Sequence, residues 1–159
     1  MKKIAVLILA MVMSLTLLTG CSNPVYDDFA NFLNVEMVEV NANYEKITAE
    51  IGNWDYLEDD VAIGKSISDV LLPLVNESLE KLAAISPATE EVKEVKAKYV
   101  KVMDAYKSAL EALLEGTETQ DDATINAGIE GINKAVELLE EYNAALEALA
   151  EEVGAEIEY

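Results

Sequence analysis

The chain has no arginine, no histidine and a single cysteine among its 159 residues. Without histidine it lacks the most common general base, the Ser-His and Cys-His nucleophile pairs, and imidazole ligands for a metal ion. Without arginine it lacks the planar group that holds a phosphate or carboxylate through two parallel hydrogen bonds. We therefore expect no enzymatic activity, and no di-metal site of the kind that helical bundles build with histidine.

Positive charge is also scarce. The chain has 11 lysines and 31 aspartates and glutamates, so its formal net charge is -20. A surface this acidic repels the phosphate backbone of DNA and RNA, so we expect no nucleic-acid partner. The length suits one domain rather than two.

The N-terminus has the features of an export signal. Lys2 and Lys3 precede a run, residues 4–18, that is apolar except for Ser14 and Thr16. A secretory signal contains an apolar run of about 7–15 residues, whereas a membrane-spanning helix needs about 20. The run therefore predicts a signal segment that is removed after export.

Leu18-Thr19-Gly20-Cys21 closes this run, and it resembles the lipobox of bacterial lipoproteins. The resemblance implies that Cys21 carries a thioether-linked diacylglycerol, that residues 1–20 are removed, and that the new amino terminus is acylated with a fatty acid such as palmitate. More than one acyl chain anchors a protein stably to a membrane. The expected location is the outer face of the cell membrane, or the outer membrane in a bacterium that has one.

Helical periodicity dominates the rest of the sequence. Apolar residues recur every three or four positions, no stretch alternates as a strand does, and there are only 3 prolines. The pattern predicts an all-α fold. We expect helices over residues 24–51, 59–85, 87–115 and 119–153.

Short sequence signals give the expected helix ends. Ser86 and Pro87 predict the start of the third helix, because a serine cap followed by proline suits the first helical turn. Gly116 predicts its end, since glycine commonly follows a helix. Thr119 and Asp122 have the spacing of a capping box at the start of the fourth helix.

Helices joined by short connections predict an antiparallel, up-down four-helix bundle that follows the N-terminal signal helix. Residues 21–159 form its single domain. Pro73 falls inside the second helix, so we expect either a kink or a short turn that ends near Ser68. In an antiparallel bundle, the connections near Trp54 and Gly116 lie at the end away from the lipid anchor.

Acidic residues gather in the two connections at that far end. They are Asp55, Glu58, Asp59, Asp60, Glu115, Glu118, Asp121 and Asp122. Ca²⁺ takes six to eight oxygen ligands, so this cluster is a candidate cation site. The other interpretation is that these acids cap helices and keep the protein soluble, because carboxylates are favourable at helix N-termini.

Aromatic residues give two further candidates. Trp54, the only tryptophan, and Tyr56 share a connection, where they either anchor a protein interface or fold over the open end of the core. Tyr99 and Tyr106 lie on one face of the third helix. They either pack in the core or leave room for a small apolar molecule between helices.

Two functions are consistent with these features. Our first hypothesis is a non-catalytic, lipid-anchored helical bundle that acts by contact with another protein of the cell envelope. The alternative is a ligand-binding lipoprotein, which holds Ca²⁺ at the acidic end or a small apolar molecule between helices. We expect no cofactor other than the covalent lipid at Cys21.

Overall fold

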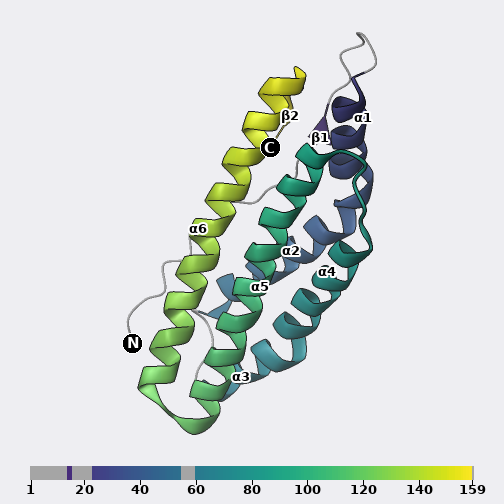
Figure 1. Ribbon diagram of the computed structural model, residues 1–159. Helices are drawn as coiled ribbons and strands as arrows, with labels where there is room; N and C mark the ends of the chain where they lie inside the picture. The colour runs from purple at the N-terminus through teal and green to yellow at the C-terminus, as the bar shows by residue number, and fades with distance from the viewer. Residues whose placement is uncertain (1–13, 16–22, 55–59, 159) are drawn as a thin grey trace.

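The computed structural model describes residues 14–15, 23–54 and 60–158. They form a helical chain with one pair of two-residue strands, which confirms the all-α prediction. The elements in chain order (Figure 1) are β1 (Ser14–Leu15), α1 (Pro24–Asn31), the π-helix η1 (Phe32–Glu36), α2 (Val38–Gly52), α3 (Asp60–Ser66), the π-helix η3 (Ile67–Leu71), α4 (Leu72–Ala84), α5 (Glu90–Thr119), α6 (Asp122–Val153) and β2 (Ile157–Glu158).

The short strands involve two residues of the predicted signal helix. Ser14 pairs with Glu158, and Leu15 pairs with Ile157, in antiparallel register. These two residues are extended because their main-chain groups pair with the C-terminal strand rather than within a helix. The helix prediction is therefore wrong at Ser14 and Leu15, and the rest of the signal segment lies outside the described residues.

The first predicted helix, 24–51, forms as a helical stretch with a π-turn inside it. Asn23 caps its start, since its side-chain oxygen accepts the N–H of Val25 at 3.1 Å. In the π-turn η1, the N–H of Met37 bonds to the carbonyl of Phe32 at 2.9 Å, five residues back. This wider turn lets both side chains reach the core, where each is fully buried, although their spacing is not α-helical.

Pro73 does not interrupt the second helical stretch, because α3, η3 and α4 follow one another without a gap. In η3 the N–H of Leu72 bonds to the carbonyl of Ile67. Pro73 then falls in the first turn of α4, where a missing N–H is tolerated. The alternative of a turn that ends near Ser68 is therefore wrong, and the structure has a π-turn, a known cause of helix kinks, directly before the proline.

The third helix begins later than predicted. α5 starts after Thr89, so the start at Ser86 and Pro87 is wrong. The N–H groups of Ala88 and Thr89 bond instead to the carboxylate of Asp28 in α1, at 3.0 and 2.8 Å. Ala88 and Thr89, the last residues of the α4–α5 connection, therefore have hydrogen-bond partners outside α5 and do not join that helix.

Gly116 does not end α5, which continues to Thr119. The helix ends at Gln120, whose φ of 55° is in the left-handed region. A Cβ atom at Gly116 would lie 2.7 Å from the main-chain nitrogen of Ile125 in α6. The prediction of a helix end was wrong because this glycine serves close helix packing.

Asp121, rather than a capping box, starts α6. One oxygen of the Asp121 carboxylate accepts the N–H of Ala123 at 3.2 Å, and the other accepts the hydroxyl of Thr124 at 2.6 Å. The expected pairing of Thr119 with Asp122 is wrong, since Thr119 lies in the last turn of α5 and donates its hydroxyl within that helix.

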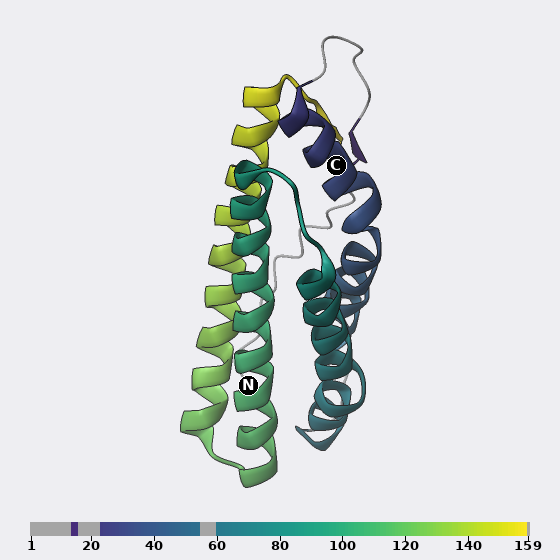
Figure 2. The same cartoon turned by 45° about the vertical axis from the view of Figure 1, so that its right-hand side comes forward.

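The helices lie lengthwise beside one another (Figures 1 and 2). α1, the start of α5 and the end of α6 lie at one end, whereas α3 and the α5–α6 turn lie at the other. α3 and α5 are accordingly close at this end. A Cβ atom added to Gly64 of α3 would lie 3.3 Å from the hydroxyl oxygen of Thr117 in α5. The connections near Trp54 and Gly116 share one end, as predicted, and α6 ends at the predicted Val153.

One hydrophobic core joins the helices. Its largest fully buried side chains are Phe29, Phe32, Leu33, Met37, Val40, Ile47, Ile67, Leu71, Leu82, Met103, Leu110 and Leu146. Glycines bring α5 and α6 especially close: a Cβ at Gly128 would lie 2.6 Å from Leu113 Cγ, and one at Gly131 would lie 2.8 Å from Ala109 Cβ.

Candidate surface groove and its surroundings

Only some of the predicted functional residues can be placed. Cys21, Asp55, Tyr56, Glu58 and Asp59 lie outside the described residues. The lipid attachment and the contribution of the first acidic connection therefore stay predictions. Trp54 and the remaining acids are described.

Among the described acids of the far end, Asp121 caps a helix. Asp60, Glu118 and Asp122 lie exposed at the ends of α3, α5 and α6. Hydrogen bonds to Asp121, first from the Thr124 hydroxyl and then from the main chain, lower the pKa of its carboxyl. Within the described ranges, no three acids are grouped to hold a metal ion. The Ca²⁺ hypothesis stays a prediction that depends on the undescribed acids.

Trp54 is buried, with 9% of its surface exposed. Its indole Nε1 donates to the Ser66 hydroxyl at 2.9 Å, and that hydroxyl donates to a carboxylate oxygen of Glu50 at 2.7 Å. The indole therefore closes the core between α2 and α3. This is the arrangement that the core-packing interpretation expects, and it leaves little of Trp54 for contact with another protein.

Tyr99 and Tyr106 belong to a buried group that also includes Tyr44 and Tyr142. The ring centroids of Tyr99 and Tyr142 are 4.7 Å apart, and those of Tyr44 and Tyr106 are 6.3 Å apart in an edge-to-face arrangement. Burial is the main cause that raises the pKa of each hydroxyl. The four rings fill the space between the helices, which favours the core-packing interpretation over a ligand site there.

A groove of about 470 Å³ opens between α2 and the η3–α4 stretch. Its lining residues are Lys46, Ala49, Glu50, Asn53, Asp69, Val70, Pro73 and Leu74. No sequence pattern described above predicts it. The signal that points to it is Pro73 within a helix, which marks a local departure from α-helical geometry beside a partner helix.

The two walls of the groove differ in chemistry. The wall from α2 is mostly polar, because Lys46, Glu50 and Asn53 recur at helical spacing along one face. The wall from η3 and α4 presents the apolar Val70 and Pro73, and Val70 keeps 37% of its surface exposed. Such a surface can take an apolar side chain and a charged group at the same time.

Buried polar side chains hold two groove residues in position. The side-chain oxygen of Asn43, a residue only 3% exposed, accepts the ammonium of Lys46 at 3.4 Å. The amide nitrogen of Asn43 is buried without a hydrogen-bond partner. Farther along the same α2 wall, Glu50 accepts the hydrogen bond from Ser66, whose hydroxyl also accepts the indole N–H of Trp54. The charges of the groove are therefore partly fixed before any ligand binds.

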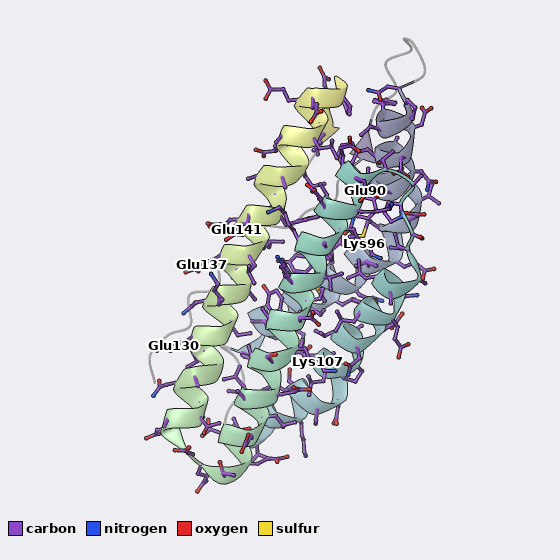
Figure 3. The ribbon with its side chains drawn as sticks, in the orientation of Figure 1. Glu90, Lys96, Lys107, Glu130, Glu137 and Glu141 are labelled. Atoms are coloured by element: carbon purple, nitrogen blue, oxygen red, sulfur yellow. The ribbon has the colours of Figure 1, made fainter. Side chains whose placement is uncertain are left out.

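Negative charge is not evenly spread over the long helices α5 and α6. α6 carries eight acids and one lysine, whereas α5 carries seven acids and five lysines. Figure 3 shows Glu130, Glu137 and Glu141 projecting from the side of α6 that faces away from α5. Because most of the surface is acidic, a positively charged partner is attracted from a distance and an acidic one is repelled.

No helix in the described part of the chain is long and apolar enough to span a membrane. No protein-family model matches the chain, and comparisons with curated proteins and with solved structures find no match. Functional inference therefore depends on the residues and geometry of this chain alone.

Proposed function

We propose that this chain is a bacterial lipoprotein that is anchored through Cys21 and acts by contact with another protein of the cell envelope. Residues 1–20 are its signal segment, and residues 21–159 form an antiparallel, up-down four-helix bundle. The lipobox-like Leu18-Thr19-Gly20-Cys21, which follows lysines and an apolar run, supports the anchor. Removal of the signal segment also removes β1, so the mature protein lacks the β1–β2 pairing.

The observation that carries the contact function is the groove between α2 and η3–α4. It is open to solvent and contains the exposed Val70. Hydrogen bonds from buried side chains position the charged Lys46 and Glu50 beside it. The groove also lies toward the α3 end of the helices, away from Asn23, where the helical body begins two residues after Cys21. An anchor at Cys21 therefore leaves the groove on the side remote from the membrane.

Metabolic labelling tests the anchor. Cells that express the chain are fed a clickable palmitate analogue, and the purified protein is weighed by mass spectrometry. We expect a mature protein that begins at a diacylglyceryl Cys21, and a Cys21→Ser variant that stays unlabelled and uncleaved. An intact leader with an unmodified thiol overturns the anchor.

Photo-crosslinking tests the contact function in the same cells. A photoreactive amino acid at Val70, in the groove, is compared with one at Val61, which is 67% exposed and lies outside the groove. We expect a discrete crosslinked envelope protein from position 70 only. Equal crosslinking from both positions, or none from either, overturns a function that depends on contact through the groove.

A further inference from the structure

The charges of the groove restrict what it can bind. Glu50 and Asp69 contribute two carboxylates, and Lys46 is the only cation among the lining residues that the structure describes. The carboxylates thus dominate the field of the groove, and the net charge of the chain, -20, adds to it. A ligand that complements this field carries positive charge.

The apolar wall restricts the ligand further. Val70, Pro73 and Leu74 face solvent or are only partly buried, so an aliphatic side chain laid against them loses contact with water. A simple metal ion or a small polyamine makes no use of this wall. A peptide that carries a basic residue next to aliphatic residues complements the carboxylates and the wall together.

From these two features we infer that the groove binds a segment of the partner protein in which a lysine or arginine lies next to aliphatic residues. The basic group lies against Asp69 and Glu50, and an aliphatic side chain packs on Val70 and Pro73. This inference rests on the proposed contact function and adds the chemistry of the partner.

Trp54 makes binding observable without a label on the protein. It is the only tryptophan, and it is joined to the groove through Ser66 and the carboxylate of Glu50. A basic group that attracts the Glu50 carboxylate weakens its bond to Ser66 and so changes the surroundings of the indole. Occupation of the groove is therefore expected to change the intensity or wavelength of tryptophan emission.

The binding test uses the protein purified from membranes in mild detergent and a labelled peptide of alternating leucine and lysine. Control peptides replace every lysine by glutamate or every leucine by serine. We expect the first peptide to bind with a change in Trp54 emission, and both controls to bind at least about tenfold more weakly. Equal binding of the leucine-lysine and serine-lysine peptides overturns the role of the apolar wall.

Matched variants separate the groove from general attraction to an acidic protein. Asp69→Lys is compared with Asp104→Lys, which makes the same change of charge on an exposed part of α5, and Val70→Ser with Val61→Ser. We expect Asp69→Lys and Val70→Ser to weaken peptide binding about tenfold, with little effect from the two controls. Equal effects of Asp69→Lys and Asp104→Lys overturn the inference. If crosslinking from position 70 persists in that case, the contact function stands and only the partner chemistry is wrong.

Discussion

The α5–α6 pair and the α2–α4 pair show two ways in which helices pack in one chain. α5 and α6 touch through Gly116, Gly128 and Gly131, so their backbones approach closely at these positions. α2 and α4 are joined across their exposed edge by the ion pair of Glu39 and Lys81, and the groove opens farther along the same pair. The α5–α6 pair is thus closely packed at its glycines, whereas the α2–α4 pair leaves part of its surface open.

The backbones of the two pairs also differ in regularity. α5 and α6 are uninterrupted α-helices of 30 and 32 residues. α2 and α4 each follow a π-turn, and η3 itself forms part of the groove wall. π-turns recur at functional sites in proteins. The comparison therefore supports the proposal that the α2–α4 pair binds the partner, while the α5–α6 pair supports the fold.

The largest expected effect tests whether the two pairs unfold together. Leu110 in α5 and Leu82 in α4 are both fully buried in the same core. Leu110→Ala and Leu82→Ala should each lower the free energy of unfolding by about 2–5 kcal/mol, because each leaves a cavity. Urea denaturation followed by circular dichroism should give a single transition for both variants. Two separated transitions in either variant would show that the pairs are independent.

A smaller effect tests the close approach of α5 and α6. Gly128→Ala places a methyl group 2.9 Å from the main-chain nitrogen of Leu113. We expect a loss of about 2 kcal/mol, since overpacking typically costs about 1–3 kcal/mol and the gain in helix propensity offsets only part of it. Gly64→Ala is the control, because the atom nearest to its added methyl group is the Thr117 hydroxyl oxygen at 3.3 Å, a smaller overlap than that at Gly128. It should leave the melting temperature unchanged or raise it, and equal losses would contradict the packing argument.

The sequence predicts the helices well because their apolar periodicity is a local property. It fails at the helix ends that tertiary contacts determine. Asp28, distant in sequence, holds the residues before α5, and Gly116 is helical because α6 approaches it. No signal in the sequence near Ser86 or Thr119 reports these contacts. The local cap signal at Ser86 and the local stop signal at Gly116 are therefore outweighed by hydrogen bonds and packing from other elements.

The candidate site was less accessible to sequence reasoning. The prediction singled out acids and aromatics, whereas the groove lies between two helices that the sequence predicts as neighbours without indicating which of their faces stay open. Lys46 and Asp69 line one groove only because α2 and η3 pack together. Pro73 was recognised as a disturbance, but its consequence, a π-turn beside an open groove, depends on the whole fold.

Asp28 gives a pH-dependent test of the contact between α1 and the α4–α5 connection. Burial raises the pKa of its carboxyl, but hydrogen bonds from the Thr89 side chain and from the Ala88 and Thr89 main chain outweigh burial, so the pKa lies below the ordinary value of an aspartate. A lowered pKa in the folded state means that the ionised carboxyl stabilises the fold above about pH 4 and that this stabilisation is lost as the pH falls through the folded value. Asp28→Asn should therefore cost about 1.5 kcal/mol at neutral pH.

Thermal unfolding of the wild type and Asp28→Asn from pH 7 to pH 2 checks this expectation. The difference in melting temperature should be largest at neutral pH and should shrink in acid. Asp27→Asn, at an exposed neighbouring carboxylate, is the control and should give a smaller difference. A difference for Asp28→Asn that stays constant down to pH 2 would show that the carboxylate charge does not hold the connection.

Ser66→Ala gives the smallest expected effect and tests whether the groove and the core are coupled. The variant removes the hydroxyl that joins Trp54 to Glu50, and leaves the indole N–H without its partner. We expect a loss of about 1 kcal/mol, at the lower end of the cost of an unsatisfied buried donor, because the nearby groove gives water access to the Glu50 side.

Tryptophan emission should change, and its response to the leucine-lysine peptide should disappear while the peptide still binds. Thr48→Val, which removes a buried hydroxyl bonded to the Glu45 carbonyl elsewhere on α2, should keep that response. If Ser66→Ala keeps it as well, the indole senses the groove by another route, and the open α2–α4 pair is less tightly linked to the core than the hydrogen bonds indicate.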